Sequence, residues 1–303
     1  IYIQLDRAIP DGTVFEITTV PGETILATYP PQQRSVANCA LVLHGNQGLG
    51  YSDVFYGESD NLEGSGFDEA MQVHQATGVP GNFHLSGTLQ SSAEWAANSG
   101  DPMDFNGWLA TGVTEGWAGM ITSAYAQHIM PFVLDNMNNW AISTESNMII
   151  DRYGYTPTVA WVPERVWLNS SGYPSGGVSD WIGDNFVNNG VGAVILDDDV
   201  HCSGHDNHQI HTMSGSSLRI IPRDRDFTGN LIGGNGQAAL DLMTYLAGSG
   251  VGPYRIAVMA EDWEAVSEMG HWGDIVPFAQ DTYDWFIGKC YDESAWLSTW
   301  KLS

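Results

Sequence analysis

Basic residues are scarce in this chain, and their scarcity excludes two classes of partner. Ten lysines and arginines stand against 36 aspartates and glutamates, which gives a formal net charge of −26; the only lysines are Lys289 and Lys301. A surface this negative repels the phosphates of nucleic acids and of anionic membranes, whereas a neutral partner meets no such penalty. We therefore expect no nucleic-acid partner. The acidity fits a solvated surface in extracellular or cell-surface conditions, or in the cytoplasm of a salt-adapted host.

Long apolar runs and paired cysteines are also missing. No apolar run approaches the roughly 18 residues that a membrane-spanning helix requires, so we expect no membrane insertion. Cys39, Cys202 and Cys290 are the only cysteines, and no CxxC spacing occurs, which excludes a disulfide framework and a zinc ribbon. The sequence also lacks a Gly-rich phosphate loop, which argues against a nucleotide cofactor.

From residue 39 onward, short apolar runs alternate with longer amphipathic stretches. The apolar runs, each with the length of a strand, lie at 39–47, 81–87, 118–125, 158–164, 192–199, 218–224 and 254–262. Helix-like stretches lie between them at 67–77, 131–142, 178–190 and 236–250, and several end at glycine. Apolar runs of this kind are typical of parallel strands that are buried on both faces, and the alternation predicts βαβ units.

Almost every apolar run ends in polar side chains, which favours a barrel. The carboxyl ends of barrel strands meet at one face and carry the catalytic groups, whereas an open doubly wound sheet gathers ligands only at its switch point. We predict an α/β fold, an incomplete TIM-like (β/α)7 barrel over residues 39–290. A short N-terminal β extension over 1–38 precedes it, because 14–31 looks like two strands around a turn. A short helical segment over 291–303 is expected to follow.

Glu164 is the first candidate for chemistry. It lies in AWVPERVW (160–167), where Pro163 stiffens the strand end and two tryptophans offer flat faces. The neighbouring Arg165 is a cation that favours the ionised carboxylate. The simpler alternative is a surface glutamate paired with Arg165, but the flanking tryptophans favour the first interpretation.

The second candidate is the acidic run Glu261-Asp262-Trp263-Glu264, which follows the last apolar run. Mutual repulsion among three carboxylates can keep one of them protonated, as a general acid must be. A solvated charge run explains these residues equally well. Two carboxyl groups placed across a glycosidic bond are the equipment for cleaving it.

Four segments together resemble the motifs of family-57 glycoside hydrolases, the family of α-amylases, branching enzymes and 4-α-glucanotransferases. The family's Trp-x-Pro-Glu motif is complete in 161–164, and its Asp-x-Glu motif is matched by 262–264. Its His-x-His-Gln-Pro motif is matched at 44–48 by the first His and the Gln, with Asn46 and Gly48 departing. The remaining motif fits 116–131, with Gly119 where the family usually has Glu.

The resemblance covers roughly residues 39–275 and implies both a seven-stranded barrel and an activity. The implied activity is that of a retaining glycoside hydrolase or transglycosylase acting on α-glucans, with Glu164 as nucleophile, Asp262 as acid/base, and no cofactor or metal. Further residues expected to bind the polysaccharide substrate are His44, Asn46, Gln47, His84, Tyr125, His128, Trp161, Arg165, His201, Trp263 and Glu264.

Two alternatives remain open. The departures at Asn46 and Gly119 and the short segment after the barrel also fit a non-catalytic glycan-binding or structural surface protein on the same fold. A metal-dependent polysaccharide deacetylase is the other, and it needs an Asp and two His on a metal. The histidine-rich stretch 201–211 matches no standard zinc spacing, so we expect it to be a loop over the active site with His201 near the substrate.

Overall fold

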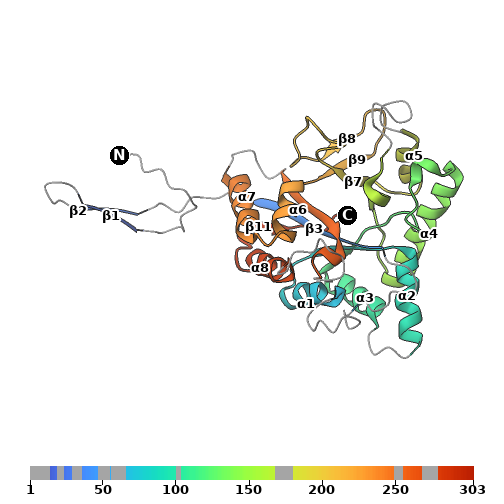
Figure 1. Ribbon diagram of the computed structural model, residues 1–303, viewed down its shortest axis with the longest axis horizontal. Helices are drawn as coiled ribbons and strands as arrows, with labels where there is room; N and C mark the ends of the chain where they lie inside the picture. Colours follow the sequence, from blue (N-terminus) through green and yellow to red (C-terminus); the bar gives the residue numbers. More distant parts are fainter. Residues whose placement is uncertain are drawn as a thin grey trace.

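All seven strands expected from the apolar runs are present. The computed structural model describes residues 14–18, 24–28, 36–46, 55, 66–99, 104–167, 180–248, 255–267 and 279–303. The strands are β3 (Ala37–Gly45), β4 (Gly81–Leu85), β5 (Ala118–Met120), β6 (Val159–Trp161), β7 (Ala193–Asp197), β9 (Arg219–Arg223) and β10 (Ile256–Asp262). The predicted α/β class is therefore confirmed (Figure 1).

The barrel strands fall into two parallel sheets. One has the order β10-β3-β4-β5, and the other has the order β6-β7-β9, with the short β8 (His211–Thr212) antiparallel at its edge. A bridge between Thr122 and Ala160 joins the two sheets on one side. On the other side the amide of Asp224 donates to the carbonyl of Val258 at 2.9 Å. Isolated contacts of this kind close the barrel where the ladders stop, as befits a barrel with fewer than eight strands.

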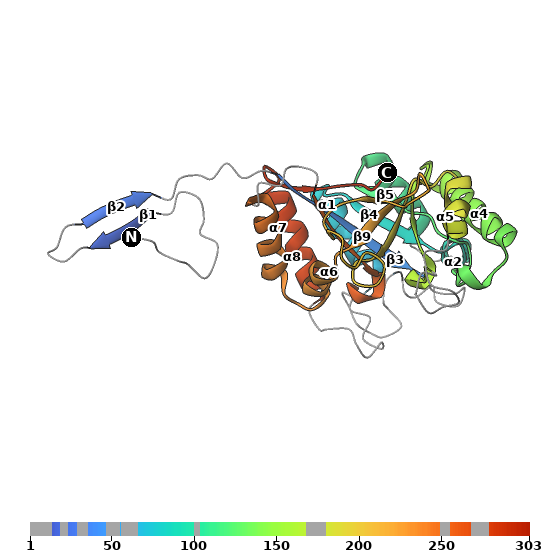
Figure 2. The ribbon, with the colours of Figure 1, turned by 90° about the horizontal axis from the view of Figure 1, so that it is seen from above.

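Helices flank the strands, as Figure 2 shows from above. They are α1 (Phe67–Thr77), α2 (Gly87–Asn98), α3 (Phe105–Glu115), α4 (Asp135–Tyr153), α5 (Asp180–Asn188), α6 (Arg225–Ile232), α7 (Gly236–Gly248) and α8 (Ala279–Asp292). The expected helical stretches correspond to α1, α4, α5 and α7. The side chain of Asp224 caps α6 by accepting from the amide of Phe227 at 2.9 Å, so a residue directly after β9 starts the next helix.

Three apolar clusters divide the core into layers. Alternate residues of β3 point to opposite sides: Ala40 and Val42 belong to a cluster built from strand residues and Leu302, which fills the barrel interior. Cys39, Leu41 and Leu43 belong to a larger cluster that packs this sheet against α1, α3, α7 and α8. The third cluster packs β6 and β7 against α4 and α5. Because both faces of the sheets are covered, the strands read as continuous apolar runs.

The two ends of the chain add strands outside the barrel repeat. β1 (Val14–Thr18) and β2 (Thr24–Thr28) form an antiparallel hairpin that stands apart from the barrel in Figures 1 and 2. β11 (Leu297–Thr299) pairs in parallel with Ala37–Cys39 of β3. The expectation of a helical segment over 291–303 is thus wrong. Leu297 is buried there, and backbone pairing to β3 outweighs the helical pattern of so short a stretch.

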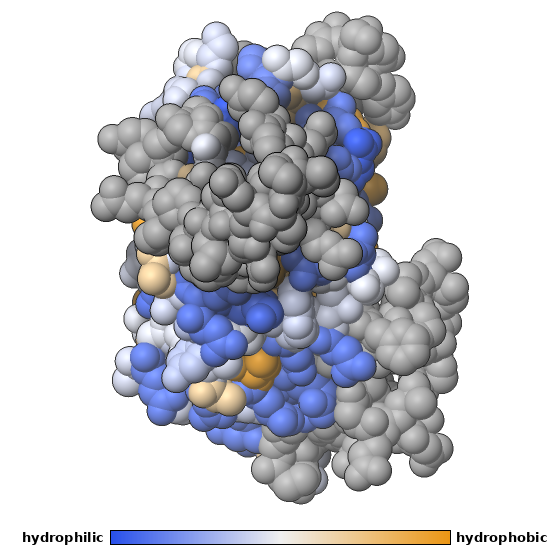
Figure 3. Space-filling view, turned by 90° about the vertical axis from the view of Figure 1, so that its left-hand side faces the viewer, coloured by the Kyte–Doolittle hydropathy of each residue, from blue (hydrophilic) through white to orange (hydrophobic). Residues whose placement is uncertain are grey.

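The described part of the surface in Figure 3 is mostly hydrophilic, as expected from the many acidic residues in the sequence. Small apolar spots lie between the hydrophilic residues on this face. None of the helices in the described part of the chain has the length and apolar character needed to cross a lipid bilayer.

Candidate active site

A row of polar residues crosses three neighbouring strands at their carboxyl ends. Asp262 on β10 lies opposite His44 on β3, which in turn lies opposite His84 on β4. Parallel pairing in register brings these side chains together, although they are far apart in sequence. The row ends at the face of the barrel where loops leave the strands, which is where barrel enzymes place their chemistry.

Glu164 reaches this face on a strained turn. It follows β6 in a short 3-10 turn (Pro163–Arg165), in which the amide of Arg165 donates to the carbonyl of Val162 at 2.8 Å. Glu164 has φ 52° and Arg165 has φ 48°, both in the left-handed region that favours glycine. Side chains held in this conformation cost about 1–3 kcal/mol each and cluster at functional sites, because the strain fixes their direction.

One small pocket gathers the two candidate carboxyl groups. It has a volume of about 160 Å³ and is lined by His44, Asn46, Trp161, Glu164, Arg165, Asp262 and Glu264. Residues from β3, β6 and β10 therefore converge on one space, although Glu164 and Asp262 are almost a hundred positions apart in sequence. Pockets for drug-sized ligands have about 300 Å³ or more, so this one suits a single sugar unit.

Two of the pocket carboxyls hold their protons unusually tightly. Burial raises the pKa of Asp262 to about 6, and repulsion from Glu261 and Glu164 adds to the shift. The positive charges of Arg165 and Arg223 oppose it. Burial raises the pKa of Glu264 to about 8, with Asp262 and Glu261 adding to the effect. Near neutral pH the pocket therefore combines a proton-bearing Glu264 with an Asp262 that titrates close to the working range of a general acid.

Two arginines organise the acids beside the pocket. The guanidinium of Arg165 lies 5.3 Å above the ring of Trp161, with Nε 3.0 Å from Oδ1 of Asp197. Its Nη1 lies 3.7 Å from Oε1 of Glu261, and Arg223 pairs with the same glutamate and lies 3.7 Å from Asp197. One aromatic face and two carboxylates therefore hold the guanidinium of Arg165, and this fixes the backbone next to Glu164.

A buried chain of three side chains lies behind His44. Its Nδ1 is 2.7 Å from Nδ1 of His84, and Nε2 of His84 is 2.7 Å from Oε1 of Glu145 on α4. The ring of His44 is also nearly parallel to that of Trp161, with centroids 4.2 Å apart. His84 and Glu145 have no exposure to solvent, so His84 supports His44 and does not line the pocket.

Trp263 needs a correction, because it does not face the pocket. It is fully buried in the cluster between the sheet and the helices, stacked on Phe67 with centroids 4.5 Å apart and an interplanar angle of 6°. β10 ends at Asp262, and Trp263 begins a 3-10 turn (Trp263–Ala265) that turns its side chain into the core, while its neighbours Asp262 and Glu264 line the pocket. It is a core residue rather than a platform for sugar.

Three other expected residues are not among those that line the pocket. Tyr125 packs against Gly87, where any side chain would clash with the ring because a Cβ would lie too close to Cδ2 of Tyr125. The ring centroid of Tyr125 is 6.2 Å from that of Trp140. His128 binds Oδ1 of Asn138 at 2.8 Å through Nε2. Burial lowers the pKa of His201, which lies among Asp197, Asp199 and Arg165. Gln47 lies outside the described residues.

Hydrogen bonds within and around the histidine-rich stretch occupy several of its side chains. His208 pairs with Asp224 at 2.8 Å, and Nε2 of His211 binds the carbonyl of Asp206 at 2.7 Å. Within the parts of the chain that the structure describes, no three His, Cys, Asp or Glu side chains come together in a way that could hold a metal ion.

Glu145 was missed by the sequence analysis. It lies in the buried face of α4 with Ala141, Ile142 and Ile149, at the three- and four-residue spacing of one helix side. A glutamate at an apolar position of an amphipathic helix is a signal, because burial of a carboxylate is costly without a partner. Its partner His84 is 61 positions away, so only the fold reveals what the glutamate does.

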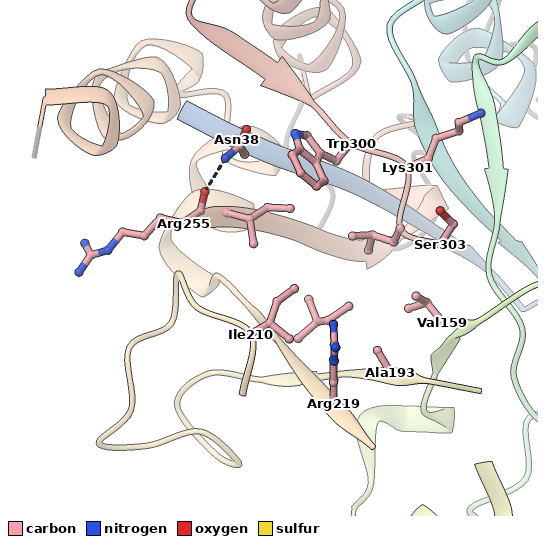
Figure 4. Close-up of a pocket in the computed structure, with 12 residues that line it drawn as sticks. Asn38, Val159, Ala193, Ile210, Arg219, Arg255, Trp300, Lys301 and Ser303 are labelled. Carbon is pink, nitrogen blue, oxygen red and sulfur yellow. Dashed lines mark hydrogen bonds between the residues drawn. The ribbon is translucent and has the colours of Figure 1, made fainter. Parts of the chain in front are cut away.

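A second cavity lies at the amino ends of the strands (Figure 4). Its volume is about 320 Å³, and its lining includes Asn38, Val159, Ala193, Arg219 and Ile256, each at or near the start of a strand. Figure 4 shows the guanidinium of Arg255 turned away from the space. Among the described residues, no aspartate or glutamate lines this cavity, whereas the pocket at the carboxyl ends of the strands is lined by three carboxyl side chains.

No protein-family model and no curated protein matches the sequence. Solved structures do. A 4-α-glucanotransferase from Thermococcus litoralis matches with a TM-score of 0.67 and 17% identity, over 88% of this chain and 39% of that protein. A GH57 branching enzyme from Thermococcus kodakaraensis matches with a TM-score of 0.63 and 10% identity, over 87% of this chain and 69% of that one.

A protein from Mycobacterium smegmatis described as a polysaccharide deacetylase also matches, with a TM-score of 0.56 and 11% identity over 90% of this chain and 88% of that one. This chain thus spans about 39% of the length of the glucanotransferase and most of the length of the deacetylase-like protein. At identities this low the likeness concerns the fold alone. The chain has the incomplete (β/α)7 barrel fold of GH57 enzymes.

Proposed function

We propose that this chain is a retaining glycoside hydrolase or transglycosylase that acts on α-glucans. The observation that carries the proposal is the convergence of Glu164 and Asp262 on one sugar-sized pocket at the carboxyl ends of the strands. The same fold in a 4-α-glucanotransferase and in a GH57 branching enzyme supports the choice of α-glucan as the substrate class.

In the proposed double displacement, Glu164 attacks the anomeric carbon while Asp262 protonates the departing glycosidic oxygen. The C–O bond to the leaving group breaks as the bond to the Glu164 carboxylate forms. In the second step, the oxygen of water or of a sugar hydroxyl attacks the anomeric carbon while Asp262 takes its proton. The bond to Glu164 breaks, and both carboxyl groups return to their starting states. Such retention requires carboxyl groups about 5–5.5 Å apart.

The surrounding residues divide the work of holding the sugar. Trp161 is buried under His44 and Arg165, so it supports these two polar groups and does not itself stack on the sugar. Glu264 carries a proton near neutral pH because of its raised pKa of about 8, so it can donate a hydrogen bond to a hydroxyl oxygen of the substrate.

Azide rescue tests the two roles separately with 4-nitrophenyl α-maltooligosides as substrate. The 4-nitrophenolate group leaves without protonation by Asp262, so the glycosyl-enzyme can form in the Asp262 variant. Glu164→Ala and Asp262→Ala should each lower kcat by at least about 10³-fold and 10²-fold, respectively. Azide should rescue both, because it replaces the lost nucleophile or attacks the intermediate that no longer finds a base. The product should be a glycosyl azide of inverted configuration with Glu164→Ala and of retained configuration with Asp262→Ala.

Glu94→Ala is the matched control, since Glu94 is an exposed carboxylate on α2 that pairs with Arg152. It should retain normal turnover. Near-normal turnover in Glu164→Ala would contradict the assignment of the nucleophile.

The deacetylase-like neighbour supports a second candidate, a metal-dependent deacetylase of a polysaccharide. Acetate release from an acetylated glycan, abolished by a chelator and restored by a divalent metal, would favour it. Binding of maltooligosaccharides without cleavage of either kind would instead favour a glycan-binding protein on this barrel.

A further inference from the structure

Three buried side chains form one hydrogen-bonded chain that ends at the pocket. Glu145 and His84 have no exposed side-chain surface, and His44 is 4% exposed where it lines the pocket. The contacts are 2.7 Å between Oε1 of Glu145 and Nε2 of His84, and 2.7 Å between the two Nδ1 atoms. Nε2 of His44 is therefore the one ring nitrogen of the chain that neither contact uses.

Each contact holds one proton. Two nitrogens 2.7 Å apart must be one donor and one acceptor, because two bare nitrogens or two N–H groups would repel each other. The contact between Nε2 of His84 and the Glu145 carboxyl likewise holds one proton. If the proton between the histidines belongs to His84, a neutral His44 carries its own proton on Nε2; if it belongs to His44, Nε2 is bare.

Charge decides between these arrangements. With the shared proton on His44, His84 is neutral and Glu145 is a carboxylate without a cationic partner in a fully buried site. Burial raises the pKa of Glu145 even though hydrogen bonds from His84 and from the backbone at Gly87 and Ser123 oppose the shift, so this charge is costly. Protonating Glu145 on Oε2 would remove that charge, but Oε2 is buried without a hydrogen-bond partner among the described residues. A buried hydroxyl without an acceptor costs about 1–3 kcal/mol.

With the shared proton on His84, the chain is neutral overall. Either Glu145 is ionised and His84 is an imidazolium, or the proton between them lies on Glu145; His84 donates to Nδ1 of His44 in both cases. Burial, followed by the effects of His84 and Arg165, lowers the pKa of His44 well below its ordinary value, so its ring stays neutral. The proton of that neutral ring then lies on Nε2.

We infer that Glu145 acts through His84 as a positioning residue that fixes the tautomer of His44, so that Nε2–H faces the pocket as a donor. The ligand of this donor is an oxygen of the substrate, namely a hydroxyl or ring oxygen of a sugar; this part alone rests on the proposed function. A sugar oxygen placed there receives a hydrogen bond that a His44 with bare Nε2 could not give.

Long-range ¹H–¹⁵N correlation spectra of histidine-labelled protein at neutral pH test the tautomer without any activity assay. His44→Gln identifies the signals of His44 by their loss. We expect a pyrrole-type Nε2 and a pyridine-type Nδ1 in the wild-type protein. The reverse pattern in the wild-type spectrum would overturn the inference, whether or not Glu145→Leu folds.

Glu145→Leu then tests what fixes the tautomer. Without the carboxyl group, both tautomers of His44 should be populated, and kcat/KM on maltooligosaccharides should fall about tenfold through a raised KM, as for one lost hydrogen bond. Glu94→Leu is the matched control on α2 and should leave the His44 signals unchanged. An unchanged His44 pattern in folded Glu145→Leu contradicts the role of Glu145. Absence of turnover in the wild-type protein contradicts the proposed function, while the spectra still decide the tautomer.

Discussion

Glu164 and Arg165 hold a backbone conformation that side chains other than glycine rarely adopt. Both neighbours of Glu164 are anchored: Pro163 is buried, and Arg165 contacts Asp197 and Trp161. The strain is therefore maintained by packing and ion pairs rather than relieved. It aims the candidate nucleophile at the pocket at the expense of stability.

Glycine at position 164 should relieve this strain. We predict that Glu164→Gly is more stable than Glu164→Ala by about 1 kcal/mol, because the left-handed penalty of about 1–2 kcal/mol exceeds the flexibility cost of glycine. Urea unfolding of the two variants measures the difference. At Asn147, an exposed position within α4, the same comparison should have the opposite sign. A Glu164→Ala that is as stable as Glu164→Gly would show that position 164 is unstrained.

Asp262 should make the folded state less stable as the pH rises. Its pKa is about 6 in the folded protein against an ordinary value of 3.8, so the folded state binds the proton more tightly. Ionisation therefore disfavours folding: the effect is absent below about pH 4 and complete above about pH 6. Asp262→Asn should raise Tm at pH 7, with a much smaller gain at pH 4.

Thermal unfolding at the two pH values measures this, with Asp241→Asn, an exposed aspartate of α7, as the control that should change little. A Tm gain of Asp262→Asn that is equal at both pH values would mean that the raised pKa is not the cause. If Asp262 is the general acid, as proposed, kcat/KM on α-glucans should fall as the pH rises above about 6, because Asp262 then loses its proton.

At the scale of elements, β11 is a structural strand outside the barrel repeat. It pairs with the first residues of β3, directly below the place where β4 begins to pair with that strand, and Leu297 is 1% exposed. β11 thus covers the part of β3 that β4 leaves unpaired, which protects an otherwise open edge.

Leu297→Ala should destabilise the protein by about 2–5 kcal/mol, as large-to-small changes in cores do. Val200→Ala is the control: the side chain is 68% exposed, and the change should stay within about 0.5 kcal/mol. Chemical denaturation of the two variants gives both values. A loss near zero for Leu297→Ala would mean that β11 is not part of the cooperative fold.

The seven barrel strands could be predicted from sequence because each lies in a short apolar run, as is typical of strands that are covered on both faces. Several helices could not. α3 (FNGWLATGVTE) contains two glycines and a run of poor helix formers, and it forms because its apolar face packs into the main cluster. β11 is only three residues long, too short for a periodic pattern.

Glu164 and Asp262 could be selected from sequence because each lies in a distinctive local motif at the end of an apolar run, and both line the same pocket. The site was not predictable where the direction of a side chain decides its role. Trp263 lies between two pocket residues and still points into the core, and Glu145 meets His84 only through tertiary packing. Side-chain direction and long-range contacts depend on the fold, so a motif alone does not supply them.

At the scale of the whole molecule, the net charge of −26 is a source of self-repulsion. The Debye length falls from about 30 Å at 0.01 M to about 3 Å at 1 M ionic strength. We predict that Tm rises between these two sodium chloride concentrations at pH 7. Salt weakens the attraction in the partly buried ion pairs of Arg165 and Arg223 only a little, whereas it strongly reduces the repulsion among exposed carboxylates.

Differential scanning fluorimetry across the salt series measures this rise. The increase should shrink near pH 4, close to the sequence isoelectric point of about 4.2, where the repulsion disappears. A Tm that falls with salt at pH 7 would mean that attractive pairs dominate the electrostatics of the fold.

The row Asp262, His44 and His84 crosses three strands at matched positions, and the residues one position before the two histidines, Leu43 and Phe83, are buried in the cluster between the sheet and the helices. A shift of β3 by one residue would turn Leu43 toward the pocket and His44 into the apolar cluster between the sheet and the helices. The polar row thus disfavours a shifted register of β3, because such a shift would both remove His44 from the pocket and bury it among apolar side chains.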